Sequence, residues 1–313
     1  MKSLLHEQLM YASYFAPRGR NRMYVLGQQV SERYLSPLDR LIGVVGAAGA
    51  GKSSMIKGMF PGLELTNDDE GVNLRPLPLL KNIDKGFFTS HTYHMDIRFE
   101  MAFTQVHILA DAVKQALSHG KRVIVEHFDL LYPALELNAD VIIGIGGEVI
   151  VVRPNLFGPF PKEIVDVSIK TLQYRKMAHT AEDLTARILL QDYGATLNFE
   201  HRDVHHGFVL EYPIAIDADL KEVERKVQLI IDEGINICYS DEGHIQMGDV
   251  SWACTGPRTH VRNTENIEQF RLVHEYKFDP KSETYLIIGL VGPLGEDLDG
   301  FASMIYNASL QSV

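Results

Sequence analysis

One short segment constrains this chain more than any other. Residues 46–53 read Gly-Ala-Ala-Gly-Ala-Gly-Lys-Ser, a complete G-x-x-x-x-G-K-S pattern. A continuous apolar run, residues 41–45, precedes it, as expected for a strand buried on both faces, and residues 52–59 are predicted to form a helix. Glycines at this spacing let the backbone turn tightly, so that successive N–H groups point into one concave nest. The pattern therefore predicts a phosphate-binding loop between a strand and a helix.

The polar residues of this loop have distinct expected roles. Lys52 would bring a positive charge to the β- and γ-phosphates of ATP, and the Ser53 hydroxyl would ligate Mg²⁺. The helix that begins there adds its positive dipole end. The expected nucleotide contacts are Gly46, Ala47, Ala48, Gly49, Ala50, Gly51, Lys52, Ser53 and Ser54. The alternative is a Gly/Ala-rich turn that binds no nucleotide.

Phosphate chemistry also needs a carboxylate for the metal or the attacking group. Glu126 and Asp129 are candidate catalytic residues, because they end the predicted buried strand 122–128 or follow it, and ligands gather at that end of parallel strands. The alternative for Asp129 is that it caps the next turn. Asp68 and Asp69 follow a possible second strand, residues 63–66, and either approach the loop or form a solvated acidic turn.

The order of predicted elements indicates the fold class of the first half. A helix over 99–118, ending at His119-Gly120, lies between the loop and strand 122–128, and residues 139–152 supply one or two strands broken at Gly146-Gly147. Such β-α-β-α-β alternation predicts an α/β fold, a parallel sheet with helices on both faces. This domain is expected to span residues 39–160.

The second half has a different order. Residues 161–193 and 219–233 are predicted to be helical, and strand-like pieces follow at 244–253, 269–278 and 284–291. This order is typical of an α+β domain, which is placed at residues 161–313. Residues 1–38 are expected to be a helical extension, with Leu4, Leu5 and Leu9 at helical spacing. The cluster of Arg18, Arg20 and Arg22 around Gly19 is typical of a solvated linker.

Composition limits the partners and the compartment. Lys plus Arg is 30 and Asp plus Glu is 41, giving a net charge of −11, which argues against a protein that coats nucleic acid or an anionic membrane. Two cysteines, Cys238 and Cys254, form no disulfide framework, so a reducing, cytoplasmic location is expected. Neither a membrane span nor a signal peptide is predicted, because no apolar run is long enough.

The first domain resembles the uridine kinase and phosphoribulokinase group of P-loop kinases. The resemblance rests on GAAGAGKSS at 46–54, Asp68-Asp69 and VIVEHFDLLY at 123–132, and it covers about residues 40–155. Residues 94–99, HMDIRF, lie where such kinases keep an aspartate and an aromatic residue near the nucleoside. The resemblance implies an ATP-dependent kinase, a P-loop NTPase fold and a nucleoside or other small phosphate acceptor. One departure is the missing arginine-rich lid, for which Arg153 and Arg175 are isolated candidates.

Residues 253–273, ACTGPRTHVRNTENIEQFRLV, resemble the signature of the second additional domain of alanyl- and threonyl-tRNA synthetases. The resemblance extends over about residues 170–290. That domain removes a wrongly attached amino acid from tRNA, so the resemblance implies aminoacyl ester hydrolysis and tRNA as a possible partner. Arg258, Arg262 and Arg271 either form a local phosphate-binding face or only solubilise the surface.

The same resemblance implies a possible Zn²⁺ site. His179 keeps the first position of the family's histidine pair, Asp183 replaces the second, and Cys254 and His260 keep the other two ligand types. Positions i and i+4 share one face of a helix, and Asp is a legitimate zinc ligand. Cys254 and His260 are separated by five residues where the family has three. The alternative is a decayed site, with His179 on the helix surface and Cys254 in the core. A further group of histidines is either a substitute ligand set or an exposed loop: His201, His205 and His206.

Three functions remain open at this stage. The first is an ATP-binding phosphotransferase of the nucleoside-kinase type fused to an editing-like domain. The second is a metal-assisted aminoacyl-tRNA deacylase regulated by ATP. The third is a non-catalytic ATP-dependent sensor.

Overall fold

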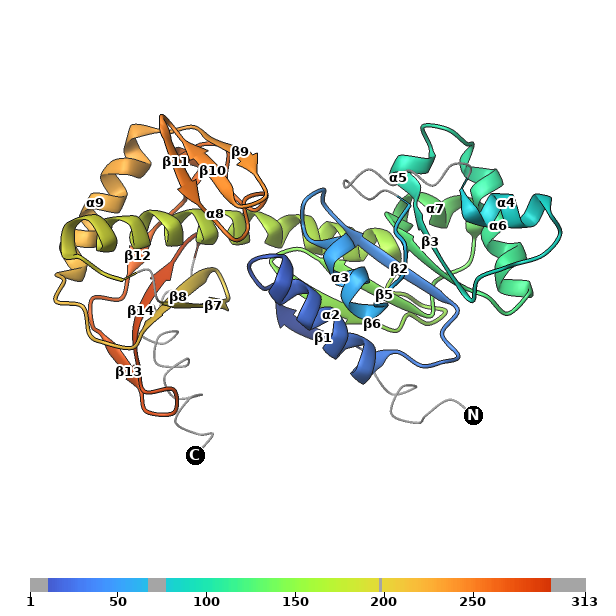
Figure 1. Cartoon of the computed structure of the whole chain (residues 1–313), viewed down its shortest axis with the longest axis horizontal. Coiled ribbons are helices and arrows are strands. Elements are labelled where there is room, and N and C mark those ends of the chain that lie inside the picture. Colours follow the sequence, from blue (N-terminus) through green and yellow to red (C-terminus); the bar gives the residue numbers. More distant parts are fainter. Residues whose placement is uncertain (1–10, 67–76, 197–198, 294–313) are drawn as a thin grey trace. The chain divides into compact units, whose positions relative to one another are not determined.

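The computed structural model of the protein describes residues 11–66, 77–196 and 199–293. The chain divides into two compact units (Figure 1). Unit 1 consists of Met1–Tyr14 and Arg20–Leu172, and unit 2 of Phe15–Gly19 and Gln173–Val313. The division falls inside one continuous helix, α8 (Pro161–Tyr193), whereas the sequence places a boundary near residue 160. The helix is continuous across the division, so no break in the secondary structure marks it. The two parts of α8 are assigned to different units because their side chains pack against different elements.

Unit 1 is built on a mixed, mostly parallel sheet. Its six strands have the order β1-β6-β5-β2-β4-β3. They are β1 (Tyr11–Phe15), β2 (Leu41–Gly46), β3 (Thr92–Asp96), β4 (Arg122–Glu126), β5 (Val141–Ile145) and β6 (Glu148–Val152). Strands β5, β2, β4 and β3 are parallel neighbours, while β6 is antiparallel to β5. Gly146-Gly147 explains this exception, since two residues can join a hairpin but not a parallel crossover.

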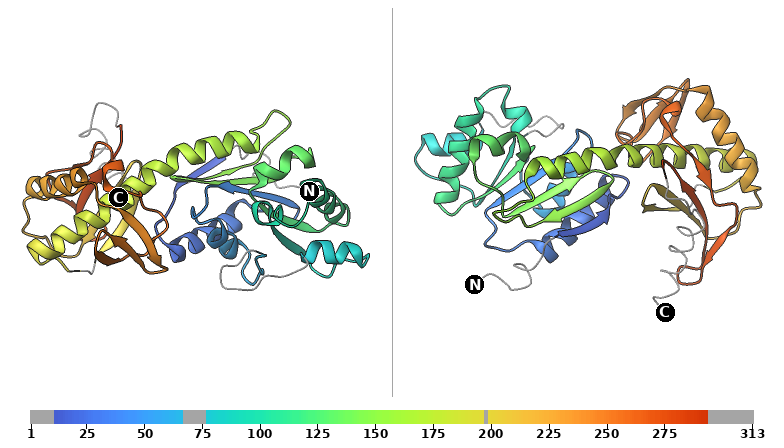
Figure 2. Two further views of the ribbon diagram at one scale, coloured as in Figure 1. Left: turned by 90° about the horizontal axis from the view of Figure 1, so that it is seen from above. Right: turned by 180° about the vertical axis from the view of Figure 1, so that it is seen from behind.

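Helices cover both faces of this sheet, as the sequence predicts. They are α2 (Arg20–Tyr34), α3 (Lys52–Met59), α4 (Pro78–Asp84), α5 (Ile97–Glu100), α6 (Val106–Ser118), α7 (Phe128–Leu135) and the first part of α8. In Figure 2, α2 and α3 lie on one face of the sheet and α8 on the other. Gly144 and Gly146 let β5 approach α8 closely, because a Cβ at either position would collide with Ser168.

Three details of unit 1 differ from the sequence predictions. The strand expected at 63–66 is wrong: those residues are irregular, and the edge strand is β3 (Thr92–Asp96) instead. The polar letters of Thr-Tyr-His-Met-Asp conceal a strand in which four of the five residues are buried. The single helix expected over 99–118 is two helices, α5 and α6. The segment 1–38 is not helical throughout, since β1 joins the sheet; Leu4, Leu5 and Leu9 lie outside the described residues.

Unit 2 combines the rest of α8 and α9 (Leu220–Glu233) with antiparallel strands. One sheet has the order β12-β14-β8-β7, with β13 also paired to β14, and the other has the order β11-β10-β9. The strands are β7 (Glu200–Val204), β8 (Gly207–Tyr212), β9 (Ile237–Asp241), β10 (His244–Met247), β11 (Val250–Ala253), β12 (Arg271–Leu272), β13 (Lys277–Asp279) and β14 (Thr284–Leu290). A short 3₁₀ turn, η1 (Thr264–Asn266), lies between β11 and β12. Both predicted helices are confirmed, and Asp219 caps α9 by accepting from Lys221 N–H at 3.0 Å.

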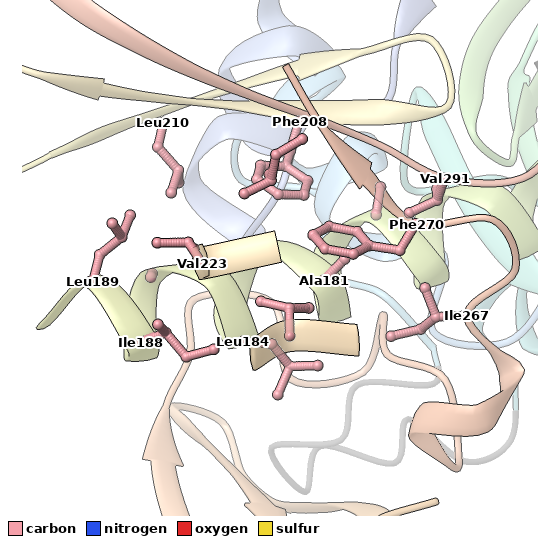
Figure 3. Packing of buried hydrophobic residues seen from close by; sticks show 14 of the residues in the cluster. Ala181, Leu184, Ile188, Leu189, Phe208, Leu210, Val223, Ile267, Phe270 and Val291 are labelled. Atoms are coloured by element: carbon pink, nitrogen blue, oxygen red, sulfur yellow. The ribbon is translucent and has the colours of Figure 1, made fainter. Parts of the chain in front are cut away.

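The core of unit 2 forms on one stripe of α8. Ala181, Leu184 and Ile188 are buried there, and Figure 3 shows them beside side chains from other elements. Phe208 of β8 and Phe270 belong to the same cluster. This packing fixes the rotation of α8 about its axis. It thereby fixes where the polar residues between these apolar ones point.

Candidate functional site

The glycine-rich loop at residues 46–53 has the backbone that its glycines predict. Gly46, Gly49 and Gly51 have φ values of 141°, 77° and 105°, a region in which a Cβ would be strained. Gly51 is also the N-cap of α3, and no side chain caps that helix. The first N–H groups of α3 therefore have no capping side chain that would compete with an anion.

Lys52 lies folded over this loop. Its Nζ donates to the carbonyl oxygens of Gly46 at 3.2 Å and Ala47 at 3.0 Å, and the side chain is buried. Burial lowers the pKa of Lys52, and the negative charges of Glu126 and Asp96 partly oppose that effect. The ammonium group is thus held by neutral carbonyls, beside carboxylates.

Glu126 ends β4, the strand next to β2, and faces the loop. Its Oε1 accepts from Ser53 Oγ at 3.2 Å and from His94 Nε2 at 3.2 Å. Thr66 N–H donates to His94 Nδ1 at 3.1 Å, so the His94 proton sits on Nε2 and points at Glu126. Burial would raise the pKa of Glu126, but the hydrogen bond from His94 and the charge of Lys52 hold that pKa below its usual value.

Of the other carboxylates predicted for this site, the structure describes Asp129. Asp129 lies in the first turn of α7, where burial raises its pKa, and its charge reaches Lys52. Asp68 lies outside the described residues. Sequence reasoning placed His94 and Asp96 near a nucleoside by resemblance and missed that both stand at the edge of the sheet with Glu126. Asp96 is paired with Glu126 in the register of β3 and β4 and caps α5, accepting from Phe99 N–H at 3.2 Å.

The isolated arginines do not replace a lid. Arg153 follows β6, which runs antiparallel to β5, so Arg153 lies at the ends of the strands opposite to the loop. There it binds Asp39 at 2.7 Å and the Tyr34 carbonyl oxygen at 2.6 Å. Arg175 donates to the carbonyl oxygen of Pro17 at 2.7 Å within unit 2. Among the described residues of unit 1, the exposed Arg98 of α5 is another candidate for the missing cation, because its charge reaches Lys52.

In unit 2, three of the four predicted zinc ligands meet. The ligand atoms of Asp183, Cys254 and His260 lie within 4.8 Å of one another. His260 Nε2 is 3.1 Å from Cys254 Sγ and 3.6 Å from Asp183 Oδ2. Tetrahedral zinc with bonds of 2.0–2.3 Å would need separations of about 3.3–3.8 Å. The two separations from His260 are therefore close to those that one ion requires.

The fourth predicted ligand points elsewhere. His179 Nδ1 is hydrogen-bonded to Thr259 Oγ1 at 2.9 Å, and its Nε2 lies 3.5 Å from Asp203. Burial lowers the pKa of His179 to about 4, because the hydrogen bond to Asp203 only partly offsets burial and the charge of Arg18 adds to it. His179 is also buried, not on the helix surface.

A guanidinium group stands where the fourth ligand was expected. Arg18, from the segment expected to be a solvated linker, is 2% exposed, so that expectation is wrong for this residue. Its Nη1 forms an ion pair with Glu182, and its Nη2 with Asp183. The same Nη2 donates to Cys254 Sγ at 3.1 Å. Two of the three converging donors are thus already bonded to a cation.

This arrangement does not fit zinc as the resident ion. Two unit charges 4 Å apart repel by about 4 kcal/mol at an effective dielectric of 20, and a divalent ion beside Arg18 doubles that cost. Burial raises the pKa of the Cys254 thiol to about 11, with Asp183 adding to it and Arg18 opposing it. Of the three converging ligand atoms, only Asp183 Oδ2 has no hydrogen-bond partner among the described residues.

The remaining predicted residues have other partners. His201 is in β7, not in a loop, and its Nδ1 bonds Glu182 Oε1 at 2.5 Å. His205 is exposed in the following turn, and His206 stacks on Tyr174 with ring centres 3.9 Å apart. Arg258 forms an ion pair with Glu242 at 2.9 Å, which neutralises part of the proposed phosphate-binding face.

Comparisons with known proteins do not assign this chain to a group. No protein-family model matches it, and no curated protein matches it in sequence. Among the described residues, none of the helices has both the length and the apolar character needed to cross a bilayer. The functional argument therefore rests on the geometry of the two sites.

Proposed function

We propose that unit 1 binds ATP through residues 46–54 and transfers its terminal phosphoryl group to a small acceptor such as a nucleoside. The observation that carries this proposal is the Ser53–Glu126 hydrogen bond of 3.2 Å. It joins the first turn of the loop helix to the carboxyl end of the neighbouring parallel strand. A carboxylate in that place serves phosphate chemistry, and an ordinary strand-to-helix turn has no need of it.

Each residue of the loop then has a defined task. The loop N–H groups and the start of α3 bind the phosphate oxygens. Lys52 exchanges the carbonyls of Gly46 and Ala47 for the β- and γ-phosphates, which bind an ammonium group more strongly than neutral oxygens do. When bound, Mg²⁺ neutralises phosphate charge, and Ser53 with Glu126 would hold it.

The acceptor belongs at the ends of β3 and β4. Asp96 and Glu126 are adjacent there, so two carboxylates face the place where an acceptor hydroxyl would approach the terminal phosphate. Glu126 is kept ionised by His94 and can hold the acceptor proton or orient the hydroxyl. Arg98 supplies exposed positive charge near the same place.

The test is ADP formation from ATP and Mg²⁺ with a panel of nucleosides, together with direct measurement of ATP binding. Acceptor-dependent ADP formation supports the proposal. ATP binding without any turnover favours the sensor, and absence of ATP binding contradicts both. The deacylase alternative depends on a metal in unit 2 and is addressed by the inference below.

A further inference from the structure

The segment Phe15–Gly19, from the last residue of β1 to the residue before α2, belongs to unit 2, although the rest of β1 and all of α2 belong to unit 1. We call it the strap. It is anchored residue by residue: Pro17 accepts from Arg175, and the Arg18 N–H donates to Asp203 Oδ2 at 3.4 Å. Gly19 has φ 83° and lies so close to Thr255 that a Cβ would be 3.0 Å from its carbonyl oxygen. These contacts hold the backbone on both sides of Arg18 and so fix the position of its side chain.

The Arg18 guanidinium is bonded at both of its terminal nitrogens. Nη1 pairs with Glu182 and donates to the His179 carbonyl oxygen at 3.4 Å, while Nη2 bridges Asp183 and Cys254. Glu182 and Asp183 are consecutive in α8 and both buried. A planar guanidinium presents two terminal nitrogens in a fixed fork, so it can pair with both carboxylates at once.

The Cys254 thiol is satisfied as a neutral group. Thr180 Oγ1 donates to the Lys176 carbonyl oxygen at 2.8 Å, so it accepts from His260 Nδ1 at 3.2 Å. His260 Nε2 is then a lone pair that accepts the S–H of Cys254 at 3.1 Å. The sulfur in turn accepts from Arg18 and from Gly256 N–H at 3.3 Å. No metal is needed to complete these bonds.

We propose that Arg18 is the resident cation of this buried site, so that unit 2 folds around a guanidinium group in place of a metal ion. Unit 2 is then a structural or binding module and not a metal-dependent deacylase. This inference is independent of ATP binding in unit 1.

The experiment measures zinc content and thermal unfolding of the purified full chain. The parent protein should carry no stoichiometric zinc, and neither EDTA nor added Zn²⁺ should shift its melting temperature. Arg18→Ala should lower the melting temperature by roughly 6–20 °C, because it leaves two buried carboxylates without their cation. Arg18→Lys should recover only part of this loss, since one ammonium cannot bridge Glu182, Asp183 and Cys254. The control is Arg22→Ala, an exposed arginine of the neighbouring helix.

Two results would overturn the proposal. One is stoichiometric zinc in the parent protein that is lost in Cys254→Ser. The other is a melting temperature of Arg18→Ala equal to that of Arg22→Ala. If Arg18→Ala does not fold, His260→Gln decides: a resident metal predicts loss of zinc and EDTA sensitivity, whereas a resident guanidinium predicts a metal-free fold that EDTA does not affect.

Discussion

Two buried cations of this protein, Lys52 and Arg18, both lie beside buried carboxylates, yet their surroundings differ. Lys52 donates to the carbonyls of its own loop, while Arg18 is bonded to two carboxylates and a thiol. Neutral carbonyls are weaker partners than phosphate oxygens, so a phosphate ligand can draw Lys52 away. Arg18 is already paired with two charged carboxylates, so an anionic ligand would not offer it stronger partners. We therefore infer the different roles proposed for Lys52 and Arg18 from the partners of each cation, since both are buried.

The largest effect is expected on turnover, from a change at Glu126 beside Lys52. Glu126→Gln keeps the shape of the side chain and removes its charge, so acceptor-dependent turnover should fall by about 100- to 10,000-fold. Melting temperature should change little, because Gln can still accept from Ser53, and the loss of ATP affinity should be smaller than the loss of turnover. Steady-state kinetics and ATP titration measure this, with Glu136→Gln at the end of α7 as the control. Full activity would remove Glu126 from the mechanism.

The next effect is expected on stability, from a change at Glu182, the carboxylate that pairs with Arg18. Glu182→Ala leaves Arg18 with one carboxylate and His201 without its partner, which should cost about 3–5 kcal/mol of unfolding free energy. Denaturant titration measures the loss. Glu222→Ala, on the exposed face of α9, is the matched control and should be nearly silent. Equal stability of the two variants would mean that the Arg18 cluster contributes nothing to folding.

Lys52→Ala should have the opposite profile to the Glu182 variant. Losing charge-assisted bonds to the β- and γ-phosphates should cost about 1.5–3 kcal/mol, roughly a tenfold to hundredfold weaker ATP affinity. The fold should persist, since the bonds of Lys52 to Gly46 and Ala47 are few and neutral. Calorimetric titration compares it with Lys114→Ala on the exposed side of α6. Unchanged ATP affinity would sink the assignment of the loop.

The smallest effect is expected for His94→Leu, which removes the donor that orients Glu126 but leaves the carboxylate in place. We expect about a tenfold fall in kcat, equivalent to roughly 1.4 kcal/mol, with ATP affinity unchanged. His91→Leu, at an exposed position before β3, is the control. A fall in ATP affinity equal to the fall in kcat would indicate a general loss of structure instead of a positioning role for His94.

Local patterns predicted much of this molecule. The loop at 46–53, strands β2 and β4, helix α9 and the whole of α8 follow from residue spacing, because each needs only its own apolar period or its own glycines. Strand β3 was misplaced, since its buried His94 and Asp96 look polar in sequence. Their burial depends on Thr66 and Phe99, whose N–H groups satisfy them.

Short-range patterns in the sequence were enough to predict the glycine-rich loop at residues 46–53 and to select Asp183, Cys254 and His260 as candidates for one cluster. Only the tertiary structure decided that Arg18 enters that site, since 164 residues separate it from Glu182. Nothing in its neighbourhood of Arg-Gly-Arg-Asn-Arg distinguishes it from a solvated arginine. Desolvating a guanidinium is favourable only where carboxylates from elsewhere meet it, and that meeting exists only once α8 and the strap have packed.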